Sequence, residues 1–156
     1  MSNFLVIQGC PCNPMIAPYF ALLVKEVGAE VNSLYRGEDA AAILHHYGKH
    51  TQAELYRELP PGTANPPGRS THELRSDAVA YPGPLGRHLE WWQQGIDVND
   101  SDVANMERAA RRHGWELFQP YRAGVEFHHL NFRFRPKARG RDRLRIIALR
   151  RTLPRH

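Results

Sequence analysis

The feature that most constrains this chain is the run 124–132, Gly-Val-Glu-Phe-His-His-Leu-Asn-Phe. Its Val, Phe and Leu residues favour a half-buried strand, yet the run also carries Glu126 and, three residues later, His129. Burying a carboxylate and imidazoles in such a strand costs free energy unless each group has a partner. A metal ion with a water molecule beside it would provide one. The run therefore suggests a zinc site whose base is a glutamate that does not ligate the metal.

The rest of the chain is typical of one small globular domain. Its 156 residues suffice for a hydrophobic core that needs no disulfide bonds. The fractions of hydrophobic residues (42%) and charged residues (24%) are typical of a soluble protein. No apolar run approaches the roughly 18 residues needed to cross a bilayer. The N-terminus has no charged segment followed by a long apolar one, so no signal peptide is expected.

Apolar spacing and turn residues predict the order of the elements. Helices are expected over 15–27, 38–47 and 51–59, and a fourth runs through Arg112 with Asp100 or Ser101 as its N-cap; Gly28 and Gly114 are the expected C-caps of the first and the fourth. Strands are expected over 4–8, 31–35, 91–98, 115–121 and 125–134, the last two as an antiparallel pair. Because helices come first and strands later, the fold class should be α+β.

The positive charge is concentrated at the C-terminus. Residues 133–156 hold ten Arg and Lys against the single acid Asp142, whereas the whole chain has a net charge of +5. Such a segment suits a polyanion such as nucleic acid, anionic lipid or anionic cell-wall polymers, and it is equally typical of a solvated linker. We therefore divide the chain into a domain over 1–134 and a basic tail or linker over 135–156.

Cysteines and most histidines have ordinary explanations. Cys10 and Cys12 are too close in sequence for a favourable disulfide and lack a second pair for structural zinc, so they are interpreted as thiols in an N-terminal turn. Of nine histidines, four stand in suggestive positions: His72, His88, His128 and His129.

The adjacent His128 and His129 point to opposite faces of a strand and cannot both face one metal. Glu126 and His129 also differ in parity, so Glu126 could reach the same site only from the turn side of the strand, beside Gly124.

Four motifs follow one another in a recognisable order: Ser70-Thr71-His72, Gly95-Ile96-Asp97-Val98, His113-Gly114-Trp115 and Glu126-Phe127-His128-His129. Together they resemble the zinc peptidases that include D-alanyl-D-alanine carboxypeptidases, vancomycin-resistance dipeptidases and phage L-alanyl-D-glutamate endolysins. That family shows a Ser-x-His, a Gly/Ala-x-Asp, a helix ending in Gly-Phe/Trp, and a Glu-x-x-His. Leu34-Tyr35-Arg36-Gly37 also resembles its Gly-Tyr-Arg-Ser segment. The resemblance covers roughly residues 15–132.

The resemblance implies a small antiparallel sheet with helices packed on one side and one zinc ion in an open cleft. His72, Asp97 and His129 would hold the zinc, with a fourth position left for water. Glu126 would act as general base on that water. Arg36 would bind a substrate carbonyl or carboxylate and stabilise the developing oxyanion.

One departure from the family pattern leaves the carboxylate ligand open. The usual His and Asp lie seven residues apart, but position 79 here is Val. Either Asp77 is the ligand after a two-residue deletion, or Asp97 is the ligand and 73–94 is an inserted loop. We prefer Asp97, because Gly95 precedes it and Val98 follows it as in the family. His88 is a rival to His72.

An insertion would also add candidate substrate contacts. Tyr81, Trp91 and Trp92 would be in a position to line the cleft and contact a muropeptide, although a core position explains Trp92 better. Tyr81 is therefore the substrate-binding candidate in this segment.

These residues predict a zinc metallopeptidase that cleaves a bond in peptidoglycan stem peptides. Small size, a basic end and no signal peptide suit the catalytic domain of a phage endolysin, made in the host cytoplasm and acting at the cell wall after release. A host D-Ala-D-Ala carboxypeptidase is the near alternative. A non-catalytic module that binds a polyanion through the basic tail is the alternative of another class. The tail lacks a nucleic-acid-reading motif, so neither nucleic acid nor membrane is the expected partner.

Overall fold

The computed structural model describes residues 4–73, 94–120 and 128–155, and the statements below concern those ranges. The elements follow the order β1 (Leu5–Ile7), β2 (Cys10–Cys12), α1 (Ala17–Val27), β3 (Val31–Ser33), η1 (Glu38–Ala40), α2 (Ala41–His46), α3 (Gln52–Glu58), β4 (Ile96–Val98), α4 (Asp100–Arg112), β5 (Leu117–Phe118), β6 (His129–Phe132) and α5 (Arg141–Thr152). The fold is α+β, as the sequence predicts. No helix within those ranges is long and apolar enough to cross a bilayer.

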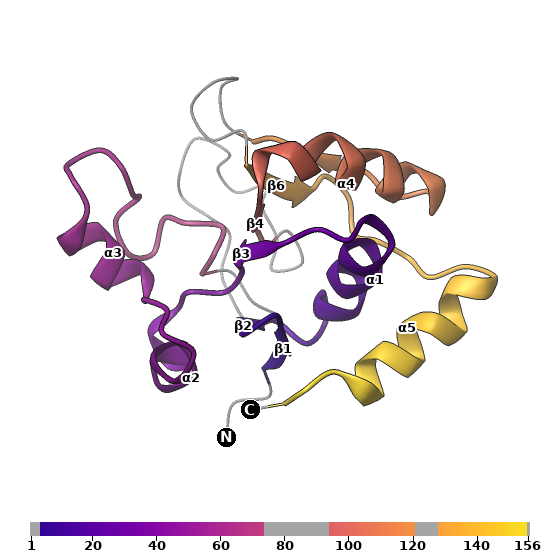
Figure 1. The fold of residues 1–156 in the computed structure, drawn as a ribbon, viewed down its shortest axis with the longest axis horizontal. Helices are drawn as coiled ribbons and strands as arrows, with labels where there is room; N and C mark the ends of the chain where they lie inside the picture. The colour runs from indigo at the N-terminus through magenta and orange to yellow at the C-terminus, as the bar shows by residue number, and fades with distance from the viewer. Residues whose placement is uncertain (1–3, 74–93, 121–127, 156) are drawn as a thin grey trace.

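The main sheet has four antiparallel strands in the order β3-β4-β6-β5, and β1 pairs with β2 in a separate two-stranded sheet. Helix α1 contacts both α4 and α5. In Figure 1 these helices lie to one side, whereas α2 and α3 lie at the opposite end of the molecule. The sheet therefore has a helix-covered face and a second face that is available for a site.

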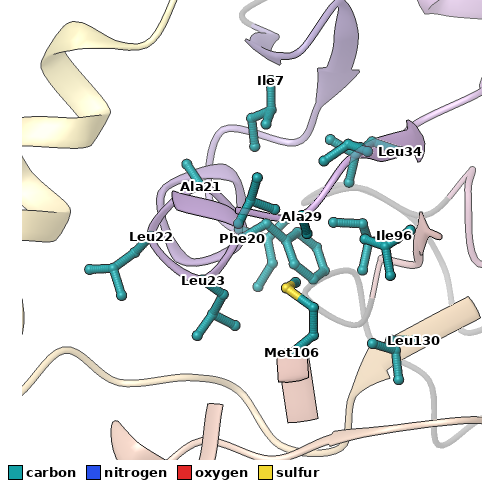
Figure 2. Packing of buried hydrophobic residues seen from close by; sticks show 14 of the residues in the cluster. Ile7, Phe20, Ala21, Leu22, Leu23, Ala29, Leu34, Ile96, Met106 and Leu130 are labelled. Atoms are coloured by element: carbon teal, nitrogen blue, oxygen red, sulfur yellow. The ribbon is translucent and has the colours of Figure 1, made fainter. Parts of the chain in front are cut away.

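The core forms where α1 and α4 meet the sheet. Phe20 of α1, Met106 of α4 and Leu130 of β6 are fully buried and belong to one hydrophobic cluster (Figure 2). The Phe20 and Phe132 rings pack with centroids 5.0 Å apart. Because side chains alternate along a strand, residues 130 and 132 point into this core, and residues 129 and 131 point to the other face.

The predicted helix ends agree closely with the structure. Gly28 ends α1 with a left-handed φ of 70° and donates its N–H to Val24 O at 2.8 Å, which only glycine adopts without steric cost. At the end of α4 the cap is His113, and Gly114 follows it with φ 77°. The N-cap of α4 is Asn99 instead of Asp100 or Ser101, so the helix begins one residue earlier than expected.

The basic C-terminal segment differs from the expected tail or linker. Its residues Arg141–Thr152 form α5, which packs on α1 through the buried Ile146. Beyond the helix, Pro154 O accepts a hydrogen bond from Val6 N at 2.8 Å, and Arg155 forms a β-bridge with Leu5. Residues 141–155 are thus tied to the N-terminal strand and belong to the folded domain.

The cysteine segment is also not the turn that we expected. Cys10–Cys12 is strand β2, paired with β1, and both thiols are buried and free. Cys12 Sγ accepts a hydrogen bond from Gln94 Nε2 at 3.4 Å. Burial raises the pKa of both thiols above the ordinary value of 9.0, so they are poor nucleophiles and poor metal ligands.

Alkaline pH should therefore destabilise the protein through these thiols. Each thiol stays protonated in the folded state but ionises above about pH 9 once unfolded, so its contribution is complete below that pH and declines as pH rises. We expect the free energy of unfolding to fall as pH rises above 9, by at most about 1.4 kcal/mol per pH unit for each thiol that stays protonated in the folded state. Urea unfolding at pH 8 to 11 measures it. The Cys10→Ala/Cys12→Ala variant should show a flatter profile, and an identical profile would contradict the prediction.

Candidate metal centre

Two neighbouring strands place Asp97 and His129 opposite each other on the face away from α1 and α4. Asp97 of β4 pairs in register with His129 of β6, and Ile96 pairs with Leu130. Ile96, Val98 and Leu130 belong to the core, so strand alternation turns Asp97 and His129 together to the other face. Asp97 Oδ1 lies 2.7 Å from His129 Nδ1.

The third residue, His72, is presented by a loop that is anchored on both sides. Its backbone O accepts from Arg36 N at 2.6 Å, and Thr71 O accepts from Gly95 N at 3.1 Å. Glu73 closes the preceding turn, because its carboxylate accepts from the N–H groups of Gly68 and Ser70 at 2.8 and 3.2 Å. The loop is therefore fixed against the segments that follow β3 and precede β4.

The hydrogen bonds around the two imidazoles fix which nitrogens carry protons. His72 Nδ1 donates to Leu34 O at 2.6 Å, which leaves the Nε2 lone pair of a neutral ring unprotonated. His129 Nε2 donates toward Asn131 Oδ1 and Thr71 Oγ1, both at 3.0 Å, which leaves its Nδ1 lone pair.

The two unprotonated ring nitrogens and one oxygen of Asp97 point toward the same place. His72 Nε2 lies 3.0 Å from His129 Nδ1 and 3.2 Å from Asp97 Oδ1. Two lone pairs and a carboxylate oxygen at such distances repel one another unless a cation lies among them. These ligand atoms are buried and lie close enough together to hold a metal ion.

Electrostatics keep His72 and Asp97 in the forms that a metal requires. Burial, followed by the positive charge of Arg36, lowers the pKa of His72 from 6.5 to about 4. Burial alone would raise the pKa of Asp97, but His72 and His129 outweigh it and hold that pKa well below 3.8. At neutral pH His72 is therefore a neutral ligand and Asp97 an anionic one.

A cleft of about 370 Å³ leads to this centre. It is lined by residues of the β3–η1 segment, α3, the 62–72 loop and the two strands: Arg36, Gln52, Leu55, Leu59, Gly62, Thr63, Ala64, Asn65, Ser70, His72, Asp97 and His128. His129 lies behind His72 and Asp97, at 1% exposure. A substrate would therefore approach from the side of Arg36 and α3.

Arg36 is held at the cleft by three side chains. Its Nη1 donates to Ser33 Oγ at 2.5 Å and lies 3.5 Å from Asp97 Oδ2, and its Nε donates to Gln52 Oε1 at 2.9 Å. Gln52 is fixed in turn, because it begins α3 directly after Thr51, whose side chain forms a capping box with Glu54. A preorganised guanidinium in this position can bind a carbonyl or carboxylate oxygen.

The structure brings together the predicted ligands His72, Asp97 and His129, with Arg36 beside them. The Gly95 N–H bond to Thr71 O brings the described residues before and after the 74–93 segment together. His128 lies on the cleft rim with Nε2 4.0 Å from Asp97. The remaining predicted residues lie outside the described ranges: Glu126, Asp77, Tyr81, His88, Trp91 and Trp92.

A second group, His50, Glu54 and Glu58, has ligand atoms close together but on the exposed surface of α3. Glu54 already serves the capping box and bonds His45 Nε2 at 2.7 Å, which is the largest cause of its pKa falling to about 2. Ion pairing at a helix start accounts for this group.

Sequence reasoning missed the residues that orient the ligands. Thr71 and Asn131 fix the tautomer of His129, and Ser33 and Gln52 hold Arg36. For Asn131 a signal was present, because it lies two residues after His129 and so shares its face of the strand. Thr71 gave no such signal, since its contact depends on the loop.

Comparison with known proteins finds no matching family model and no similar curated protein or solved structure.

Removing the Asn131 acceptor should weaken metal binding. Asn131→Leu keeps the number and branching of the side-chain heavy atoms but deletes the oxygen that fixes His129, so we expect a 10- to 100-fold higher metal Kd. Thr71→Val should have a smaller effect while Asn131 remains, and the double variant a larger one. Competition with a chelator dye measures these values. An unchanged Kd in the double variant would contradict the assignment of the His129 tautomer.

Proposed function

We propose that this chain is a zinc-dependent peptidase that hydrolyses a peptide bond in the stem peptides of bacterial peptidoglycan. The observation that carries the proposal is the convergence of His72, Asp97 and His129, with their lone pairs on one point, beside Arg36 in a cleft. The ordered motifs that resemble the zinc peptidases supply the reaction class and the substrate.

The donor set suits a catalytic metal. Two neutral imidazoles and one carboxylate leave a coordination position open, as in catalytic zinc sites. The same set also serves non-haem Fe(II), so the metal's identity is part of the test. Zinc bound there would supply Lewis acidity and lower the pKa of a water molecule.

The chain's own residues would carry the proton and the substrate. Glu126 would take a proton from the attacking water as its oxygen adds to the peptide carbonyl carbon. As the C–N bond breaks, the same carboxyl would return the proton to the leaving amine. Arg36 would orient the substrate through a carbonyl or carboxylate oxygen and stabilise the negative charge that develops there.

The setting that we propose is that of a phage endolysin, made in the host cytoplasm and acting at the cell wall after release. A host carboxypeptidase that trims terminal D-alanine is the second candidate, carried by the same residues. The products separate them, because an endopeptidase releases peptide fragments with new amino termini and a carboxypeptidase releases free D-alanine.

Metal content and wall hydrolysis test the proposal together. We expect about one zinc per chain by elemental analysis for Zn, Fe and Mn, and turbidity loss of purified cell walls with new products by mass spectrometry. Glu126→Gln should keep the metal and lose about 10²- to 10⁴-fold in rate. The matched control is Glu30→Gln, which changes an exposed carboxylate that accepts from Asn99 Nδ2 and should retain activity. Bound iron, or no hydrolysis by the zinc-loaded protein, would contradict the proposal that the chain is a zinc-dependent peptidase.

A further inference from the structure

A row of cations directly follows strand β6. Arg133, Arg135, Lys137 and Arg139 are exposed at every second position. Between the last three, Pro136 is buried and Ala138 packs against the core. From 135 to 139 this alternation is that of an extended chain with one face inward, whereas Phe134 is also exposed and the chain bends at 133–134. Arg135, Lys137 and Arg139 therefore project outward about 6.6 Å apart at 3.3 Å per residue, and together with Arg133 they form a row that we call the ladder.

The ladder borders a large open groove. The groove measures about 970 Å³ and runs between the end of α4, the turn into β5 and the 133–139 segment. Its lining holds five Arg and Lys side chains, Arg111 together with the ladder, against the two carboxylates of Glu107 and Glu116. Such a concentration of one charge sign in a hollow attracts a polyanion.

The groove is held in shape by contacts of the described residues. Arg133 N donates to Glu116 O at 2.9 Å, its guanidinium bonds Glu116 Oε1 at 2.8 Å, and it stacks 4.3 Å above Phe118. Trp115 Nε1 donates to Lys137 O at 2.9 Å. Because the backbone is anchored at both ends, little order has to be gained on binding.

From these observations we infer that the groove binds a linear polyol-phosphate polymer of the bacterial cell wall. Adjacent phosphates joined through three carbons are six bonds apart, or about 7 Å when extended at bond lengths near 1.5 Å, which matches the ladder. The choice of a wall polymer over nucleic acid rests on the proposed function. Of the aromatic residues that line the groove, Trp115 is buried and Phe118 is covered by Arg133, which leaves the exposed Phe134, whereas single-stranded nucleic acid binders stack successive bases on a series of rings.

The groove lies close to the metal centre along strand β6. His129 and Phe132 are the two ends of β6, and Arg133 follows directly. At about 3.3 Å per residue, the ladder starts about 13 Å from the metal centre. A wall polymer held there would keep the cleft close to the peptides of the same wall.

The test uses the full chain and a poly(glycerol phosphate) probe, with Kd measured by calorimetry over a series of salt concentrations. Arg135→Gln/Lys137→Gln/Arg139→Gln should raise Kd at least 10-fold and flatten the dependence of log Kd on log salt by about two units, since three contacts each contribute about 0.7. The control, Arg141→Gln/Arg143→Gln/Arg151→Gln, removes the same charge from exposed positions of α5 and should change Kd less than threefold. Lys137→Glu alone should also weaken binding if the triple variant unfolds.

Equal losses in the two triple variants would overturn the inference, because net charge alone would then explain binding. Tighter binding of single-stranded DNA with the same number of phosphates would overturn it in favour of nucleic acid. Asp97→Ala should bind the probe like the wild type. Probe binding without any peptidase activity would therefore leave the groove in place while the proposed function fails.

Discussion

Asp97→Ala should abolish metal binding at physiological zinc concentrations and, with it, hydrolysis of cell walls. Sites with four protein ligands bind zinc with about 10–16 kcal/mol, so one ligand contributes about 3–4 kcal/mol, or roughly 10²- to 10³-fold in Kd. Asp97 also pairs with Arg36 and lies 2.7 Å from His129 Nδ1, so its loss loosens the whole centre. The measurements are elemental analysis, and the rise in melting temperature that zinc causes in the wild type.

Two matched variants make that result specific. Asp100→Ala removes an exposed carboxylate from the first turn of α4 and should keep both zinc and activity. Asp77→Ala tests the alternative ligand and should also keep both. If Asp77→Ala instead loses zinc while Asp97→Ala retains it, the assignment of Asp97 is wrong and the ligand lies in the 74–93 segment.

Gly95→Ala should weaken metal binding almost as much, although it replaces none of the three ligands. A Cβ at this position would lie 2.6 Å from His129 Nε2 and 2.7 Å from Thr71 Oγ1, far inside van der Waals contact. The backbone cannot retreat without breaking the Gly95 N–H bond to Thr71 O. We expect about 1–3 kcal/mol of destabilisation from overpacking and a metal Kd at least 10- to 100-fold higher, because His129 must turn away.

Gly28→Ala is the control for general destabilisation. No atom lies within 4 Å of its added Cβ, but its φ of 70° is unfavourable for alanine, at a cost of about 1–2 kcal/mol. Urea unfolding of the metal-free proteins should therefore show both variants destabilised, with metal affinity lost only in Gly95→Ala. Normal affinity in Gly95→Ala would mean that the loop bearing Thr71 yields, contrary to the close packing that we describe.

Local sequence was enough to predict much of the scaffold. Helical spacing and Gly28 located α1, and the ordered motifs pointed to His72, Asp97, His129 and Arg36. These signals are readable because they are short-range: a glycine that must adopt positive φ, a residue facing a strand's polar side, a small residue two positions before a carboxylate. Within β6 the side chains alternate as the parity rule requires, but His128, which precedes the strand, also lies on the cleft with Nε2 4.0 Å from Asp97 Oδ1, so the rule did not separate His128 from His129.

Short-range signals were insufficient where the partner lies far along the chain. Cys10–Cys12 resembles a turn in isolation, but pairing with β1 makes it a buried strand. The C-terminal segment is basic enough to suggest a solvated tail, yet Ile146 and the contact with α1 make it a packed helix.

The metal centre divides in the same way. The sequence by itself determined which side chains can ligate a metal, since residue type and strand parity set donor chemistry and facing. Tertiary structure alone decided that Asp97 lies opposite His129 and that Gly95 meets Thr71 across the start and end of the 74–93 segment. It also decided that Asn131 and Thr71 fix one imidazole while Leu34 fixes the other. Such contacts arise from strand register and loop anchoring between distant residues, which no local pattern of residues encodes.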